Sequence, residues 1–262
     1  MAKKGNYVEK KFECKRDGLT IRGLLFEPLN NVKVNNEGKW PVAIVSHMFM
    51  VNYKLTVKYA RFLAEKGYLA VCYDFNGGGM FSKSEGKSVN MSVLTEVKDL
   101  EAVIEATLKH EKADASRLTL MGCSQGGFVS ALVAAKHPEM VEKLVMFYPA
   151  LSIPDDARKG QMLMAKFDPE NPAEVIKCGF MKLGRQYVTD VINMNAFEEI
   201  SKYEGPVLIL HGTADTAVDV SNSKKAVEVY KNARLELLEG AGHGFFKENE
   251  KKALALLGDY VK

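Results

Sequence analysis

Three residues whose types together can cleave an acyl bond occur in this chain in the order Ser, Asp, His. Ser124 lies in Gly-Cys-Ser-Gln-Gly at residues 122–126, directly after an apolar run and before a helix-like one. Asp215 ends a His-Gly-Thr-Ala-Asp segment, and His243 lies between two glycines, which allow a sharp bend. A G-x-S-x-G elbow exposes its serine in a strand-to-helix turn, and its partners follow in this order. The pattern predicts a serine hydrolase.

Each member of this set has a chemical role. A serine hydroxyl is a weak nucleophile at neutral pH, so Ser124 needs a base, and an imidazole such as His243 suits that task. The carboxylate of Asp215 is expected to fix the tautomer of His243 and to stabilise its protonated form. Asp219 is a nearby alternative acid, but Asp215 is favoured because it lies just past a predicted strand.

Other interpretations of the same residues stay open. Ser124 is also suited to cap the following helix, Asp215 to form a turn, and His243 to be an ordinary loop histidine. His211 ends a predicted buried strand and is expected to be structural. Cys123 carries a good nucleophile, but its position one residue before the centre of the elbow should point its thiol away from the reacting atom.

Acyl transfer also needs N–H donors for the oxyanion of its tetrahedral intermediate. The backbone N–H of Gln125 follows the serine at the start of a helix, where N–H groups have no helical partner. The second donor is expected in the loop at residues 46–50, with the backbone N–H of Phe49 favoured. We therefore predict an oxyanion hole formed by Phe49 and Gln125.

The elements that position these residues alternate between short apolar strands and amphipathic helices. The expected strands cover residues 8–14, 19–26, 41–47, 68–73, 118–122, 144–147, 206–211 and 234–238. The expected helices cover residues 53–66, 93–109, 124–136, 222–232 and 246–261. This alternation indicates an α/β protein whose mostly parallel, doubly wound, eight-stranded sheet begins with an antiparallel hairpin. The predicted catalytic side chains then follow the carboxyl ends of strands, where such sheets bind ligands.

The alternation breaks in residues 152–200. From about residue 152 to 195 the sequence has prolines and methionines but no apolar strand, and a strand then returns at residue 206. We interpret residues 152–200 as a small insertion between two strands of one sheet. The whole chain, residues 1–262, is expected to be a single domain.

Composition narrows the remaining function classes. The chain has 262 residues, 47% of them hydrophobic and 26% charged, and a net charge of only +3, which does not favour a nucleic-acid partner. No apolar run is long enough to predict a membrane span, and no leader-like segment is seen, so a cytoplasmic protein with reduced cysteines is expected. No metal-ligand spacing or phosphate loop is present, so no cofactor is predicted. A homodimer stays open.

At these motifs the chain resembles the α/β-hydrolase superfamily, and within it the feruloyl (cinnamoyl) esterase-like group. The general marks are Gly-Cys-Ser-Gln-Gly-Gly at 122–127, an Asp-x-x-Gly-x-Gly…Ser-x-Gly pattern at 74–86, and the Asp215 and His243 segments. Residues 153–160 and 166–171 resemble the small lid of these esterases. The resemblance implies that the insertion is a lid over Ser124, and that Asp156 and Tyr187 hold the phenolic ring of a hydroxycinnamate. An exposed Tyr187 and a helix-capping Asp156 are the alternatives.

The chain also departs from that group. The oxyanion loop usually reads His-Gly-Phe, whereas this chain has His-Met-Phe at residues 47–49, and its lid is rich in methionine. We therefore predict a serine carboxylesterase that hydrolyses small or aromatic esters, with hydroxycinnamates such as feruloyl esters among them, through an acyl-enzyme. A thioesterase, a lipid-ester hydrolase and a non-catalytic ligand-binding homologue are the alternatives. A peptidase of the prolyl oligopeptidase type is not favoured, because its large propeller has no room here.

Overall fold

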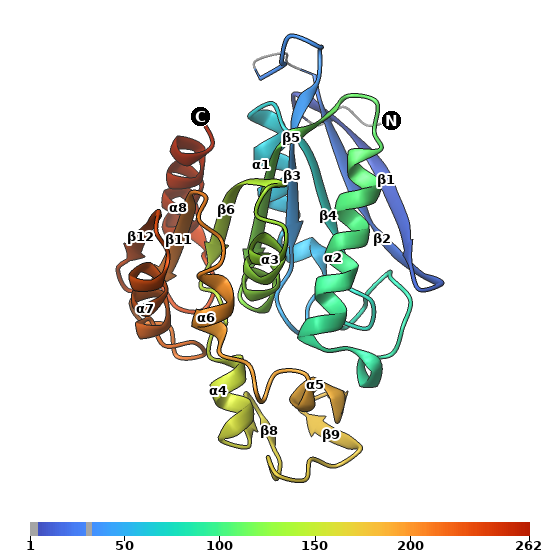
Figure 1. Ribbon diagram of the computed structural model, residues 1–262. Helices are drawn as coiled ribbons and strands as arrows, with labels where there is room; N and C mark the ends of the chain where they lie inside the picture. The colour runs from blue at the N-terminus through green and yellow to red at the C-terminus, as the bar shows by residue number, and fades with distance from the viewer. Residues whose placement is uncertain (1–4, 30–32) are drawn as a thin grey trace.

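One eight-stranded sheet organises the computed structural model, which describes residues 5–29 and 33–262. The strand order is β1-β2-β4-β3-β5-β6-β11-β12 (Figure 1). The strands are β1 (Tyr7–Arg16), β2 (Leu19–Pro28), β3 (Trp40–Ser46), β4 (Leu69–Tyr73), β5 (Ala113–Cys123), β6 (Val141–Phe147), β11 (Val207–Gly212) and β12 (Ala233–Leu238). β2 pairs antiparallel with β1 and β4, and all other neighbours are parallel. The predicted sheet with its N-terminal hairpin is confirmed.

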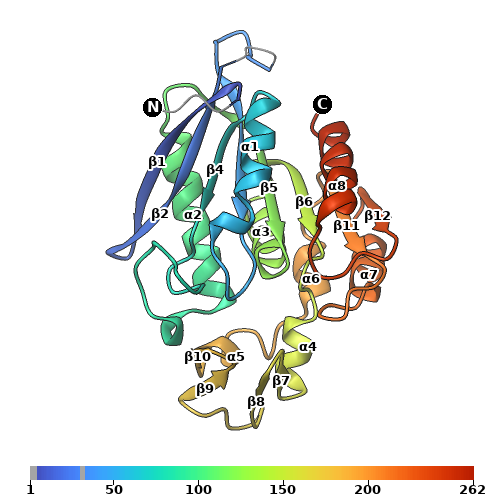
Figure 2. The ribbon, with the colours of Figure 1, turned by 180° about the vertical axis from the view of Figure 1, so that it is seen from behind.

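Helices cover both faces of this sheet (Figures 1 and 2). The helices α2 (Val93–Leu108), α3 (Gln125–Lys136) and α7 (Ser221–Val229) pack on one face, and α1 (Val57–Glu65) and α8 (Lys247–Tyr260) on the other. Alternate residues of β3 explain why both faces are needed. Val42 and Ile44 pack with α2 and α3, whereas Ala43 and Val45 pack with α1 and α8. A strand buried on both faces appears in the sequence as a continuous apolar run.

The helix predicted at residues 53–66 is divided in two. A 3-10 helix, η1 (Tyr53–Leu55), comes first, and α1 begins only after Thr56. The side chain of Asn52 accepts a hydrogen bond from the Lys54 N–H and so caps η1. A second 3-10 helix, η2 (Ser88–Asn90), precedes α2.

Most of the insertion at residues 152–200, which we call the lid, lies below the sheet in Figure 1, whereas its last helix packs beside α3 and α7. It contains the helices α4 (Ile153–Arg158), α5 (Gln186–Thr189) and α6 (Ala196–Ile200). Its strands form two small antiparallel pairs, β7 (Gln161–Met162) with β8 (Ala165–Lys166) and β9 (Val175–Cys178) with β10 (Met181–Gly184). The expectation that no strand occurs here was therefore wrong. These strands have only two or four residues each, too few for a clear alternation in the sequence.

No helix among residues 5–29 and 33–262 has the length and apolarity that a bilayer crossing requires. The four cysteines are free thiols.

Candidate active site

Ser124 lies at a strained turn between β5 and α3. Its backbone has φ 52° and ψ −120°, in the left-handed range that residues with a side chain rarely adopt. Such strain persists only when the surroundings fix it, and it occurs preferentially at functional sites. Ser124 makes no side-chain capping hydrogen bond to α3, so the helix-cap alternative does not account for it.

The glycines of the elbow are required by close contacts. A Cβ at Gly122 would lie 2.0 Å from the carbonyl oxygen of Gly126. A Cβ at Gly126 would lie 2.3 Å from the carbonyl oxygen of His47, in the predicted oxyanion loop. The absence of these side chains therefore allows α3, β5 and the loop at residues 46–50 to meet at Ser124.

The structure brings Ser124, His243 and Asp215 together. His243 Nε2 lies 2.9 Å from Ser124 Oγ, and His243 Nδ1 lies 2.7 Å from Asp215 Oδ2. A carboxylate only accepts, so Nδ1–H donates to Asp215 and Nε2 is free to accept the serine proton. The alternative acid, Asp219, is exposed and accepts from the Ser221 N–H at the start of α7 instead.

Asp215 is held as a carboxylate by several donors. Its side chain is fully buried, and Oδ1 accepts from the backbone N–H groups of Ala217 (2.9 Å) and Val218 (3.0 Å). Burial raises its pKa, but hydrogen bonds from His211, His243 and the Val218 N–H outweigh burial and leave the pKa well below its ordinary value. Asp215 therefore stays ionised over the neutral range.

His211 is a contributor to this site that the sequence analysis took to be only structural. Its Nε2 lies 3.2 Å from Asp215 Oδ2 and 3.0 Å from the carbonyl oxygen of Val218, and both of these atoms are acceptors. Nε2 therefore carries the proton, and Nδ1 lies 2.6 Å from Ser223 Oγ. Asp215 thus contacts two histidines. The His-Gly-x-x-Asp spacing could have indicated this contact, because it puts His211 at the end of β11 and Asp215 in the turn that follows the strand.

The glycines beside His243 differ in their roles. Gly244 has φ +123°, which favours glycine, whereas Gly242 is outside the left-handed range and a Cβ there would find its nearest atom 3.9 Å away. The expected sharp bend therefore depends on Gly244 alone. The ring of Tyr148 packs edge-on against His243 with centroids 4.8 Å apart, a contact that the sequence analysis did not identify.

The two predicted oxyanion donors come from two segments, the start of α3 and the loop after β3. Gln125 is the first residue of α3, so helix geometry leaves its backbone N–H without an intrahelical partner. Phe49 lies in the loop after β3, and the buried ring of His47 fixes that loop. His47 Nε2 accepts from the Phe75 N–H at 3.1 Å, so its Nδ1 donates to the Met48 carbonyl at 2.6 Å. Burial lowers the pKa of His47, which favours this neutral form.

Tyr187 and Asp156, the predicted substrate contacts, both have partners within the protein. Tyr187 is only 2% exposed, so the alternative of an exposed lid tyrosine is wrong, and its hydroxyl donates to Gln125 Oε1. Asp156 lies inside α4 and does not cap it, and its carboxylate accepts from the Ser152 hydroxyl at 2.8 Å. Burial raises the pKa of Asp156, and burial is also the main cause of the raised pKa of Tyr187, to which the charge of Asp156 adds.

The remaining sequence candidates do not form a second reactive centre. Cys123 is fully buried, and burial raises the pKa of its thiol to about 12, so it is not a thiolate at neutral pH. Within the part of the chain that the structure describes, no group of three or more His, Cys, Asp or Glu side chains could hold a metal ion.

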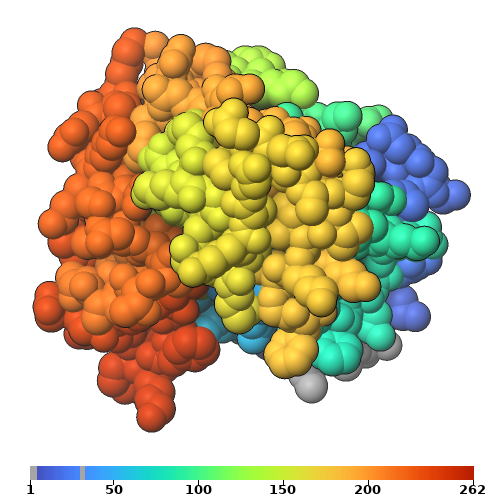
Figure 3. Space-filling model, turned by 90° about the horizontal axis from the view of Figure 1, so that it is seen from below, coloured from blue at the N-terminus to red at the C-terminus, as the bar shows by residue number. Residues whose placement is uncertain are grey.

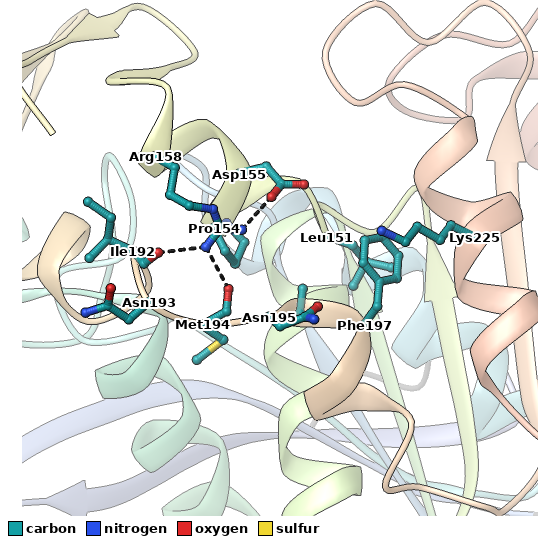
Figure 4. A pocket seen from close by; sticks show the side chains of 11 residues that line it. Leu151, Pro154, Asp155, Arg158, Ile192, Asn193, Met194, Asn195, Phe197 and Lys225 are labelled. Carbon is teal, nitrogen blue, oxygen red and sulfur yellow. Dashed lines mark hydrogen bonds and ion pairs between the residues drawn. The ribbon is translucent and has the colours of Figure 1, made fainter.

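A cavity of about 460 Å³ lies between the lid and α7 (Figure 4). It is lined by α4, residues 192–197 and Lys225, and its lining includes neither Ser124 nor His243. Arg158 crosses it to donate to the carbonyl oxygens of Ile192 (2.7 Å) and Met194 (2.9 Å). We therefore do not assign this cavity to the acyl group. Figure 3 shows the lid atoms (yellow) over the middle of the lower face of the molecule.

Known proteins resemble this chain in both sequence and structure. Residues 54–261 match the prolyl oligopeptidase family. The chain is 22% identical over 263 residues to monoacylglycerol lipase ABHD6 of Rattus norvegicus, covering 86% of this chain and 76% of that protein. It is 26% identical over 142 residues to the acylamino-acid-releasing enzyme of Sus scrofa, covering 52% of this chain and 19% of that enzyme.

Among solved structures, Est1E from Butyrivibrio proteoclasticus with ferulic acid bound matches with a TM-score of 0.82 and 29% identity, covering 96% of both chains. The DcsB complex with its substrate analogue matches with a TM-score of 0.76 and 23% identity, covering 97% of this chain and 98% of that one, and shows the fold alone. The preference for an esterase over a peptidase within the fold stays a prediction. The chain is a serine hydrolase with the α/β-hydrolase fold, and it belongs to the prolyl oligopeptidase family.

Proposed function

We propose that this enzyme is a carboxylesterase that acts on small or aromatic esters through an acyl-enzyme intermediate. The observation that carries this proposal is the continuous contact from Asp215 through His243 to Ser124, with distances of 2.7 Å and 2.9 Å, at a strained elbow. Nucleophile, base and orienting carboxylate are then in the order that acyl transfer needs.

The proposed reaction has two halves. Ser124 Oγ attacks the ester carbonyl carbon while His243 Nε2 takes the serine proton, and the N–H groups of Gln125 and Phe49 hold the oxyanion. Collapse of this intermediate breaks the bond to the alcohol, which leaves with the proton from His243 and gives the acyl-enzyme. Water then attacks the acyl-enzyme with His243 as base, and the acid leaves as Ser124 regains its proton.

Aromatic acyl groups are proposed from the side chains near the elbow. The rings of Phe49 and Tyr187 lie with centroids 5.5 Å apart, so the side chains beside the oxyanion loop are aromatic. The similar protein Est1E was solved with ferulic acid bound, which supports a hydroxycinnamate as one acyl group. Since Tyr187 already donates to Gln125, its oxygen is left to accept from a substrate hydroxyl.

Lipid esters are the second candidate substrate class, and exposed apolar side chains at the turns of the two lid hairpins favour them. Leu163, Met164 and Phe180 are 53%, 63% and 93% exposed, an unusual set of apolar side chains to present to water. The chain also resembles a monoacylglycerol lipase in sequence. A monoacylglycerol therefore belongs in the substrate panel.

The test compares hydrolysis of 4-nitrophenyl acetate, methyl ferulate and a monoacylglycerol by the wild type and by Ser124→Ala. We expect the wild type to hydrolyse the first two, and Ser124→Ala to lose at least about 10³-fold in kcat and all labelling by a fluorophosphonate. Cys123→Ala is the matched control, because it changes the neighbouring buried side chain and should keep the labelling. Turnover of acetate alone would remove the hydroxycinnamate. A Ser124→Ala protein as active as the wild type would reject the mechanism.

A further inference from the structure

The lid is fastened to one stretch of chain by three residues spaced four apart, Ser88, Ser92 and Glu96. Ser88 Oγ donates to the carbonyl oxygen of Lys182 in β10 at 2.6 Å. Ser92 Oγ donates to Asp190 Oδ2 at the end of α5 at 2.5 Å. Ser88 and Ser92 therefore contact the lid directly. Glu96 contacts the lid only indirectly, through Gln125 in the elbow.

Glu96 makes that third contact from the interior. It is buried in α2, and its Oε2 accepts from Gln125 Nε2 at 2.7 Å. Gln125 Oε1 on the other end of the amide accepts the hydroxyl of Tyr187, so the amide is held at both ends. Gly78 leaves room for the second carboxyl oxygen, since a Cβ there would lie 2.8 Å from Glu96 Oε1.

A buried carboxyl group needs a reason to be present, because burial without full pairing is costly. Glu96 Oε1 has no hydrogen-bond partner within the described part of the chain. Burial, the largest cause, raises the pKa of Glu96, and the hydrogen bond from Gln125 only partly opposes it. If this position only had to fill space, an apolar side chain would stabilise the fold more than a carboxyl group does.

Tyr187 also contacts the other side of the oxyanion hole. Its ring packs on the ring of Phe49 at 5.5 Å between centroids, while its hydroxyl holds the side chain of Gln125. One lid residue therefore touches both residues whose backbone N–H groups are assigned to the oxyanion. A displacement of Tyr187 would act on both donors together.

We propose that Glu96, the side chain of Gln125 and Tyr187 form a relay that positions the oxyanion hole, with Glu96 and Tyr187 as positioning residues for ester hydrolysis. The proposal rests on the proposed function, because it presumes that the N–H groups of Phe49 and Gln125 stabilise the transition state. Neither Glu96 nor Tyr187 exchanges a proton with the substrate. Each acts by fixing where the two donors point, and small displacements at such positions are costly to catalysis.

The experiment uses Tyr187→Phe, Glu96→Leu, Glu96→Gln and the double variant of Tyr187→Phe with Glu96→Leu. The readouts are kcat and KM for 4-nitrophenyl acetate, the affinity for phenylboronic acid, which forms a tetrahedral adduct with serine, and the thermal midpoint. Asp190→Ala is the control, since it cuts the Ser92 fastening on the same helix of the lid without touching Gln125.

We expect Tyr187→Phe and Glu96→Leu each to lower kcat about 10- to 100-fold, less than the loss of a whole donor, with KM within about twofold. Affinity for the boronic acid should fall with kcat. The double variant should be no worse than the more damaged single variant, because both cut one relay. Glu96→Gln keeps an acceptor for Gln125 and should keep kcat within about threefold, as should Asp190→Ala.

Two results would overturn the relay. One is a wild-type kcat in Tyr187→Phe. The other is a loss of kcat that accompanies a lower thermal midpoint in Asp190→Ala as much as in the relay variants. Should Glu96→Leu fail to fold, Tyr187→Phe and Glu96→Gln decide the question. A wild type without ester turnover overturns the proposed function and the relay with it, whereas an active wild type with an indifferent Tyr187→Phe overturns the relay alone.

Discussion

At the scale of single residues, the surroundings of Asp215 decide how His243 is held. Oδ1 accepts two backbone N–H groups, and Oδ2 lies against both His243 and His211. Because these contacts favour the ionised form, the stability that they contribute is present above the ordinary pKa of an aspartate. It is lost as the pH falls toward the lowered pKa of the folded state.

Exchange of the two candidate acids is the first residue-scale prediction. Asp215→Asn should lower kcat by about 10⁴-fold while the fold persists, because an amide cannot hold His243 in the tautomer that accepts the serine proton. Asp219→Asn should stay within about twofold, since Asp219 is exposed and only accepts from Ser221 at 2.8 Å. Steady-state kinetics on 4-nitrophenyl acetate measure both. Equal losses in the two variants would contradict the assignment of Asp215.

The sequence could single out Ser124, Asp215 and His243, which the structure brings into contact, because their motifs specify backbone shape as well as residue type. The partners of Tyr187 were not predictable in the same way. Its hydroxyl contacts a residue 62 positions away, and no local pattern encodes which lid side chain meets the amide of Gln125. The second contact of Asp215 with His211 was within reach, since both belong to one five-residue motif.

At the scale of elements, the elbow depends on how closely α3 approaches the loop after β3. Gly126→Ala puts a Cβ 2.3 Å from the His47 carbonyl and 2.8 Å from that of Ser46, both of them backbone atoms. We expect a loss of about 2–3 kcal/mol in the free energy of unfolding, together with lower activity as the oxyanion loop is pushed away. Urea denaturation measures the loss.

Gly242→Ala is the matched control for this prediction. Gly242 also belongs to a catalytic motif, but a Cβ there would meet its nearest atom only at 3.9 Å. Its free energy of unfolding should change by less than about 0.5 kcal/mol. If Gly126→Ala were as stable as Gly242→Ala, the loop at residues 46–50 would be able to move away from the added Cβ without a cost in stability, which would contradict the prediction.

The core strands were predictable as continuous apolar runs and the core helices by their period, whereas the lid strands were too short for either signal. In β9 only Ile176 and Cys178 turn inward, and in β10 the close approach of Gly184 to the Val89 carbonyl sets the position. A Cβ at Gly184 would lie 2.0 Å from that oxygen. Contacts with η2 therefore hold this hairpin, and a tertiary contact of this kind leaves no periodic trace in the sequence.

At the scale of the whole molecule, a buried ion pair joins the edge hairpin to the layer of helices. Arg16 Nε in β1 lies 2.7 Å from Asp99 Oδ1 in α2, and Asp99 Oδ2 accepts from the Asn76 N–H at 2.8 Å. Burial outweighs these contacts and raises the pKa of Asp99 to about 6. The fold therefore loses stability through Asp99 as the pH rises from about 4 to about 6.

Asp99→Asn should remove this loss. Relative to the wild type, the variant should gain about 2 kcal/mol in the free energy of unfolding between pH 4 and pH 7, because only the wild type must ionise a buried carboxyl group. Parallel urea titrations at several pH values give the difference. A difference that does not change with pH, or that changes in the opposite direction, would contradict the prediction.

The position of the lid in the chain has a consequence for how this enzyme can diversify. The lid leaves the sheet after β6 and returns at β11, and these two strands are direct neighbours, with Phe147 opposite Leu210. Because β6 and β11 are parallel, the chain must cross from the carboxyl end of β6 to the amino end of β11, which takes a dozen or more residues but sets no upper limit on the length of the connection. Residues 152–200 thus form a cassette that can be exchanged without a change of strand register. A replacement insertion must then supply a donor in place of Tyr187 for the side-chain amide of Gln125.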